Sequence, residues 1–411
     1  MTYLPRMVDG LLDDLMAGLP AVLVVGPRAC GKTTTGRRHV RDVLQLDRPA
    51  DADLVRADPD IALRTRVTPL LIDEWQLVPE VLGAVKRAVD GAMGTGRFVI
   101  TGSAQSDLTA AGWPLTGRAV RLAMWGLCER ELVGDPHAIS VLDRLADQGV
   151  AALRPPRRMI DLIGYVDIAL RGGLPEVALQ PDTRLRRRWL TSYVDEIVAR
   201  DGALVDGSRD PIRLRRYLQA WAANMAGVVE HRTLYEAAEI NRATAVGYDG
   251  LLGALLVVDS LPAWSTNRLS RLTGRPKRHL VEPALVGPLL GVDAAGALRD
   301  PDLLGRLLES FVVAQLRPEL AVAEVAPRMF HLRDRDGRHE VDVVIELSDG
   351  RIIGIEVKAA ATVRRADCRH LVWLRDHLGD RMVCGLVLHA GPHTFALDEH
   401  ILAAPIASLW S

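Results

Sequence analysis

The chain has 411 residues, enough for two or three domains, and its 48% hydrophobic and 25% charged residues are ordinary for a globular protein. A net charge of −1 excludes a polyanionic partner held by overall charge, so any nucleic-acid surface must be a local patch. The four cysteines form no CxxC pair, which argues against a disulfide framework and a zinc site.

The N-terminal segment predicts an amphipathic helix over residues 3–19. Asp9, Asp13 and Asp14 precede the first apolar run, which is unlike a signal peptide. The longest apolar runs are far below the ~20 residues of a membrane span. We therefore expect a cytoplasmic protein with no membrane partner.

Residues 22–34 contain the strongest motif of the chain. The apolar run 22–25 predicts a buried strand, and Gly26, Gly31, Lys32 and Thr33 then fill the fixed places of GxxxxGK[ST]. Backbone N–H groups of such a loop cradle phosphates, the lysine reaches the β- and γ-phosphates, and the hydroxyl holds Mg²⁺. The predicted ATP-binding residues are Gly26, Pro27, Arg28, Ala29, Cys30, Gly31, Lys32, Thr33 and Thr34.

A second apolar run, 69–72, ends in Asp73 and Glu74. Hydrolysis of a phosphoanhydride needs one carboxylate to order Mg²⁺ and a neighbour to orient the attacking water. We predict that Asp73 takes the first role with Thr33, and that Glu74 takes the second.

Further strands are predicted at 43–47, 97–100 and 118–124, and residues 48–59 are predicted as a connection. Alternation with helical segments predicts a parallel sheet of about five strands with helices on both faces. Ser103 and Thr101 follow the fourth strand and are candidates to hold the attacking water, although a simple strand cap fits them equally well. Arg118 is a candidate catalytic finger, although a surface arginine is the commoner case.

Residues 135–210 are arginine-rich and helical, and residues 211–263 predict three helices followed by a hairpin, the outline of a winged helix. Asn241 is predicted to cap the third helix. A basic flank follows, made of Arg268, Arg271, Arg275, Lys277 and Arg278. Packing between domains is favoured over DNA recognition, with a phosphate contact left open.

Residues 340–359 predict a β-hairpin with one buried face and a turn near Asp349. Asp342 then pairs across the hairpin with Glu356, with Cβ atoms about 5 Å apart, and Lys358 shares their face. Two carboxylates at this distance can share a divalent metal, and an adjacent ammonium can orient water or a phosphate oxygen. The alternative is a solvated face of paired charges.

The segments GPRACGKTT, LLIDEWQ, FVITGS, LTGRAVRL and HLRDRDGRHEVDVVIE, in this order, resemble a prokaryotic family of AAA-type ATPases. Its members carry a C-terminal domain of unknown function that ends in a PD-(D/E)XK nuclease-like fold. The resemblance covers nearly the whole chain. It places Asp342, Glu356 and Lys358 on the nuclease motif, with Glu309 as a further carboxylate.

The resemblance implies an α/β fold in three parts. The first is a P-loop ATPase domain over residues 1–134, the second a helical and winged-helix-like region over 135–275, and the third a small restriction-endonuclease-like domain over 276–411. We therefore predict an ATP- and Mg²⁺-dependent switch or motor coupled to a nuclease-like domain that acts on DNA or RNA. The alternative is an ATP-regulated binding module for a protein or DNA, and a homo-oligomer is open in both cases.

Overall fold

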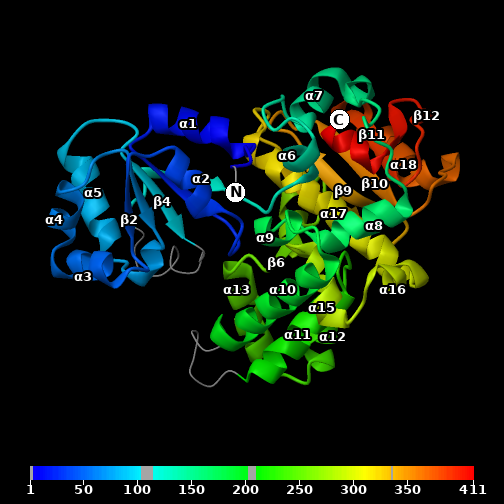
Figure 1. Ribbon diagram of the computed structural model, residues 1–411. Helices are drawn as coiled ribbons and strands as arrows, with labels where there is room; N and C mark the ends of the chain where they lie inside the picture. The colour runs from blue at the N-terminus through cyan, green and yellow to red at the C-terminus, as the bar shows by residue number, and fades with distance from the viewer. Residues whose placement is uncertain (1–2, 103–113, 202–209, 335–336) are drawn as a thin grey trace.

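The computed structural model describes residues 3–102, 114–201, 210–334 and 337–411, which form two lobes (Figure 1). The first lobe contains five parallel strands in the order β2-β3-β4-β1-β5. They are β1 Ala21–Val25, β2 Asp42–Gln45, β3 Leu70–Asp73, β4 Phe98–Gly102 and β5 Ala119–Ala123. The carboxyl ends of parallel strands share one edge of the sheet, where ligands bind in folds of this kind. The predicted parallel sheet is confirmed.

Helices cover both faces of this sheet, as predicted. Val22 and Val24 point into a core with α1 (Val8–Gly18), beside which lies α2 (Lys32–Arg38). Leu23 and Val25 point to the other face, into a core with α3 (Pro49–Ala57), α4 (Pro59–Arg64) and α5 (Val81–Gly91). Alternate residues of one strand thus anchor opposite helical layers, because side chains alternate along a strand.

The prediction that residues 48–59 form a connection is wrong, because α3 and the start of α4 occupy them. Both helices begin with a proline in the first turn, where the missing N–H has no helical partner to lose. The Asp58 carboxylate caps α4 by accepting from the backbone N–H groups of Asp60 and Ile61. Proline and aspartate therefore mark helix starts in this segment.

The second lobe begins with helices. They are α6 Glu129–Val133, α7 Val141–Gln148, α8 Leu162–Arg171, α9 Pro175–Ala178, α10 Thr183–Glu196, α11 Pro211–Ala223, α12 His231–Ala237 and α13 Arg242–Ala254. Asn241 caps α13 by accepting from the Thr244 N–H at 2.8 Å, as predicted. Strand β6 (Val258–Leu261) pairs antiparallel with β7 (Lys277–Leu280), and α14 (Arg268–Thr273) lies between them in the chain. This small sheet joins strands on either side of the division predicted at residue 275.

A six-stranded sheet forms the C-terminal part, in the order β12-β13-β11-β10-β9-β8. Its strands are β8 Arg328–Arg333, β9 Glu340–Glu346, β10 Ile352–Lys358, β11 Met382–His389, β12 Phe395–Asp398 and β13 Ile401–Pro405; the helices nearby are α15 Val286–Leu290, α16 Ala294–Arg299, α17 Pro301–Val322 and α18 Arg369–Leu378. Strands β9 and β10 are antiparallel, and their paired residues run from Ile352 opposite Glu346 to Ile355 opposite Val343, one position short of the predicted pair of Asp342 and Glu356.

The prediction that this hairpin has only one buried face is wrong. Val343 and Ile345 join the core that contains α17, whereas Val344 and Ile352 join a second core with Leu371 of α18. A helix on each face therefore buries apolar residues on both sides of the hairpin, and Glu356 near its end is buried with them.

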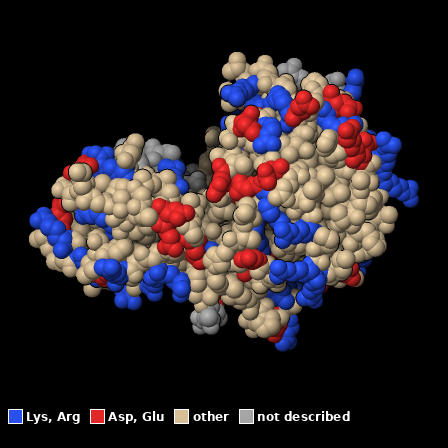
Figure 2. Space-filling view, turned by 90° about the horizontal axis from the view of Figure 1, so that it is seen from above, with Lys and Arg blue, Asp and Glu red and all other residues tan. Residues whose placement is uncertain are grey.

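One hydrophobic core runs from α1 through α17 into the C-terminal sheet, so the two lobes are packed together. In Figure 2 acidic side chains gather where the lobes meet, and basic side chains are scattered over both lobes. No helix in the described ranges is both long and apolar enough to cross a membrane.

Candidate functional site

The loop between β1 and α2 has the backbone that a phosphate cradle requires. Gly31 has φ 101°, a left-handed value that side chains rarely allow, and Ala29 has φ 58°. A Cβ on Gly26 would lie 2.0 Å from the Met124 carbonyl oxygen of the segment that follows β5. Glycine at position 26 thus lets the loop pack against the neighbouring segment.

Lys32 is buried and folded back on this loop. Its ammonium donates to the carbonyl oxygens of Gly26 at 2.9 Å and Pro27 at 2.8 Å. These two hydrogen bonds hold the positively charged Lys32 ammonium against the P-loop, next to the backbone that would contact a phosphate chain.

Thr33 and Asp73 meet at the carboxyl edge of the sheet. The Thr33 hydroxyl donates to Asp73 Oδ1 at 2.8 Å, and the Thr101 hydroxyl donates to the same oxygen at 2.5 Å. A hydroxyl and a carboxylate side by side are oxygen ligands that suit Mg²⁺. The residues present therefore fit the metal, and Thr101 is the candidate at the end of β4 that the structure brings to the site.

Glu74 follows β3 in a left-handed conformation, with φ 56° and ψ 44°. Such a conformation costs a non-glycine residue on the order of 1 kcal/mol and is found preferentially at functional sites. Its carboxylate accepts a hydrogen bond from Gln76 Nε2. The strained turn aims Glu74 at the phosphate pocket, beside Asp73.

The pocket at this loop has a volume of ≈ 660 Å³ and is bounded by both lobes. The first wall comes from the P-loop, Asp47, Glu74 and Leu77; the second comes from α9 and α10, through Pro175, Glu176, Trp189, Ser192, Tyr193 and Glu196. The Tyr193 hydroxyl donates to the Arg28 carbonyl oxygen at 3.3 Å, and its ring stacks on Trp189. Of the predicted ATP-binding residues, Gly26, Pro27 and Cys30 are not in this lining.

One predicted catalytic residue is not at this pocket. Arg118 immediately precedes β5, so it lies at the amino ends of the strands, whereas the P-loop lies at their carboxyl ends. Its guanidinium pairs with Asp90 at 2.5 Å. It therefore cannot act on the nucleotide of its own chain, and action on a neighbouring chain stays a prediction. Ser103 lies outside the described residues.

Arg6 is a residue that no motif or spacing in the sequence singles out. Its guanidinium donates to the Cys30 carbonyl oxygen of the P-loop at 3.0 Å, to the Trp125 carbonyl at 2.7 Å and to Glu131 at 3.0 Å. Burial acts to lower its pKa, but the charge and hydrogen bond of Glu131, together with smaller contributions from Cys30 and Cys128, outweigh burial and the pKa is raised. Arg6 thus fixes the back of the P-loop to α6.

Helix α6 joins three parts of the molecule through three consecutive buried charges. Glu129 pairs with Arg171 of α8, Arg130 pairs with Glu319 of α17 at 2.6 Å, and Glu131 pairs with Arg6. In sequence these residues resemble an exposed helix face. Only the long-range contacts show that α6 is the junction between the P-loop and the second lobe.

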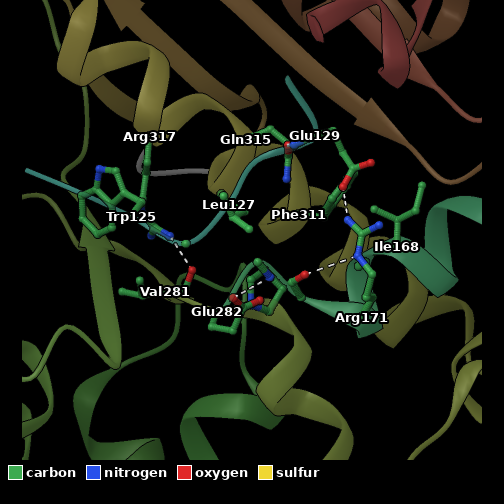
Figure 3. A pocket seen from close by; sticks show the side chains of 16 residues that line it. Trp125, Leu127, Glu129, Ile168, Arg171, Val281, Glu282, Phe311, Gln315 and Arg317 are labelled. Atoms are coloured by element: carbon green, nitrogen blue, oxygen red, sulfur yellow. Dashed lines mark hydrogen bonds and ion pairs between the residues drawn. The ribbon is translucent and has the colours of Figure 1, made fainter. Parts of the chain in front are cut away.

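A small cavity of ≈ 30 Å³ lies beside this junction. Figure 3 shows side chains reaching it from four segments, among them Trp125, Glu129, Arg171, Glu282 and Arg317. The Gly173 N–H donates to Glu282 at 2.8 Å, and burial raises the pKa of Glu282. The Arg-Gly-Gly-Leu-Pro segment after α8 is thereby attached both to α6 and to the segment after β7.

The C-terminal carboxylates lie in one cluster with two lysines. Lys358 donates to Glu356 at 2.7 Å, and the Val357 N–H donates to Asp342 at 2.9 Å. Lys277 of β7 donates to Glu309 and to Asp342. The alternative of a solvated face of paired charges holds in part: Lys358 pairs with Glu356 and is half-buried, as is Asp342, whereas Glu356 itself is buried. The sequence predicts Lys277 only as part of a basic flank.

The fold and the geometry of the first site define a P-loop ATPase domain, and the family model described as an AAA domain matches residues 19–133. The chain belongs to the same family as two uncharacterized mycobacterial proteins, Rv2008c of Mycobacterium tuberculosis and Mb2031c of Mycobacterium bovis. Each is 30% identical over 400 residues, which cover 94% of this chain and 80% of the relative. Two domains of unknown function, DUF8612 and DUF4143, match residues 163–296 and 304–409.

Solved structures give more distant likenesses. The Walker-type ATPase PABY2304 of Pyrococcus abyssi is 13% identical, with 70% of this chain and 96% of that chain covered and a TM-score of 0.43. A DNA polymerase III gamma subunit-related protein of Thermotoga maritima is 11% identical, with 76% and 100% covered and a TM-score of 0.23. Neither likeness informs the function.

Proposed function

We propose that this chain binds ATP with Mg²⁺ at the P-loop and hydrolyses it as a molecular switch. The observation that carries the proposal is the Thr33 hydroxyl 2.8 Å from the Asp73 carboxylate, on a loop with phosphate-binding backbone. Bound Mg²⁺ would neutralise charge that develops on the phosphates during transfer. Thr33 and Asp73 would hold the ion, Lys32 would contact the β- and γ-phosphates, and Glu74 would orient the water.

The contacts of α6 support a switch rather than an isolated hydrolase. Arg6 touches the P-loop backbone, and the α6 charges lead to α8 and α17. Tyr193 of α10 touches the P-loop from the second lobe. A phosphate that moves the loop would therefore strain both contacts, which is how a local event biases a larger rearrangement.

ATP turnover of Lys32→Ala tests this function. Removing one group that stabilises charge in the transition state typically lowers turnover by about 100-fold or more, so we expect at least that loss. Lys86→Ala is the control, because Lys86 is on α5 and outside the pocket lining. Turnover by Lys32→Ala at the parent rate would contradict the proposal.

For the C-terminal domain we propose the non-catalytic alternative, a module whose partner is a protein or DNA. Its support is that part of the basic flank is used internally: Arg271 pairs with Glu346 and Lys277 pairs with Glu309, with these side chains largely buried, whereas Arg275 pairs with Glu230 at the surface. The nuclease hypothesis keeps its motif residues Asp342, Glu356 and Lys358. Mg²⁺- or Mn²⁺-dependent cleavage of DNA or RNA that disappears in Asp342→Ala would favour the nuclease instead.

A further inference from the structure

A single buried ammonium sits among the C-terminal carboxylates. Lys277 is 1% exposed, and its Nζ lies 2.8 Å from Glu309 Oε1, 3.2 Å from Asp342 Oδ1 and 3.6 Å from Glu340 Oε1. The carboxylates come from α17 and β9, whereas the lysine comes from β7. The Lys277 ammonium therefore contacts three carboxylates and occupies the position in which a metal ion would be coordinated by them.

The remaining oxygens of the motif are also largely engaged. Asp342 Oδ2 accepts from the Val357 N–H at 2.9 Å, and Glu356 Oε2 accepts from Lys358 at 2.7 Å. Glu356 Oε1 is buried and has no hydrogen-bond partner in the described chain. A metal bridging Asp342 and Glu356 would compete with two ammonium groups. Within the described ranges, no group of three or more His, Cys, Asp or Glu is arranged to hold a metal ion.

Lys277 is held in place by its neighbours on β6 and β7. His279, two residues along the same strand, has its Nδ1 2.9 Å from the Ser310 hydroxyl of α17. Arg317 of α17 donates to the Val281 carbonyl and to Asp259 of β6, both at 3.1 Å. These contacts dock the small sheet of β6 and β7 on α17. The position of the Lys277 ammonium is therefore set by the packing of β7 rather than by a freely moving side chain.

Burial and mutual contact also shift the pKa values of the groups in this cluster. Burial raises the pKa of Glu309 to about 8, and burial together with Asp342 raises the pKa of Glu356 to about 8. Burial would lower the pKa of Lys277, but Glu309 and Asp342 outweigh it and the pKa is raised.

We propose that the Lys277 ammonium takes the place of a divalent cation in this cluster, so that the C-terminal domain binds no metal while β7 is docked on α17. The inference is independent of ATP hydrolysis. It gives the non-catalytic state of the domain a physical basis: the site that resembles a nuclease centre is neutralised by the chain itself.

Mn²⁺ binding to the full chain without nucleotide, measured by titration calorimetry, tests the proposal. The proteins are the parent, Asp342→Asn, Lys277→Ala, Lys277→Arg and the double variant Lys277→Ala with Asp342→Asn. Any Mn²⁺ bound at the P-loop is common to all five proteins. The informative comparisons are therefore the parent with Asp342→Asn, and Lys277→Ala with the double variant. We expect the parent and Asp342→Asn to bind the same amount of Mn²⁺. We expect Lys277→Ala to bind one more ion per chain than the double variant, and Lys277→Arg, which keeps the charge, to match the parent.

Two results would overturn the inference. One is a parent chain that loses a bound Mn²⁺ on Asp342→Asn, because the cluster would then hold metal beside the lysine. The other is a folded Lys277→Ala with no ion beyond the double variant. If no Lys277 variant folds, the comparison of the parent with Asp342→Asn decides the question, since neither protein changes Lys277.

Discussion

The P-loop site and the C-terminal cluster use the same residue types in opposite ways. Asp73 is held by the neutral hydroxyls of Thr33 and Thr101 at the edge of a ≈ 660 Å³ pocket. Asp342 is held by an ammonium and a backbone N–H in a buried cluster. Hydroxyl partners leave the carboxylate charge available to an incoming cation, whereas an ammonium neutralises it. The identity of the neighbours, rather than of the acid, decides whether such a site is open to a ligand.

Removal of the internal cation should have the largest effect on stability. Lys277→Met leaves Glu309 and Asp342 buried without it, and breaking a buried ion pair in this way typically costs about 3–5 kcal/mol. We expect a loss of that size in the free energy of unfolding, measured with urea. Lys86→Met on α5 should change it by less than about 0.5 kcal/mol. A Lys277→Met chain as stable as the parent would show that the buried carboxylates do not need the lysine as a counter-ion, which would contradict the contrast drawn with the P-loop site.

Glu74→Gln tests the P-loop site. Removal of the group that positions water should lower ATP turnover by about 100-fold while binding stays within about twofold, because the amide fills the same space. Turnover assays and titration with ATP separate the two effects. Glu80→Gln, at the N-terminus of α5 and outside the pocket lining, is the matched control. Equal losses in both variants would assign the effect to the fold rather than to Glu74.

Tyr193→Phe probes the contact between the second lobe and the P-loop. Loss of the hydrogen bond to the Arg28 carbonyl should weaken ATP binding by about fivefold, since one such bond contributes about 1 kcal/mol. Calorimetry of ATP binding measures the change, with Tyr235→Phe on α12 as the control. Unchanged affinity would mean that α10 lines the pocket without supporting the loop.

The smallest expected effect concerns His39, which follows α2 behind the P-loop. Its ring nitrogens lie 2.6 Å from Asp13 and 3.4 Å from Asp9, and the hydrogen bond to Asp9 raises its pKa above the ordinary 6.5. A raised pKa stabilises the fold below the unfolded pKa, and this stability is lost as pH rises through the folded one.

We therefore expect the parent to lose about 0.5 kcal/mol more than His39→Gln between pH 6 and 8, the scale of a partly exposed pair. Urea unfolding at both pH values measures the difference, and the exposed His137→Gln is the control. A steeper loss in His39→Gln would reverse the sign and refute the assignment.

Much of the fold follows from local patterns. The apolar run before Gly26 and the motif through Thr33 predicted β1, the P-loop and α2, because a loop of this kind has few alternative conformations. The alternation around Asp349 predicted the register of β9 and β10, since turn position fixes strand pairing. The error at residues 48–59 arose because proline and aspartate occur at helix starts as well as in loops.

The sequence by itself determined which residues could make an ATPase site, since Lys32 and Thr33 are adjacent in the chain and Asp73 ends a recognisable strand. Only the tertiary structure decided the rest. Arg130 meets Glu319 across 189 positions and Lys277 meets Asp342 across 65, separations at which no local periodicity constrains a pair. Burial then changes what these charges do, because a lysine that is a surface cation in water becomes the required counter-ion of buried carboxylates.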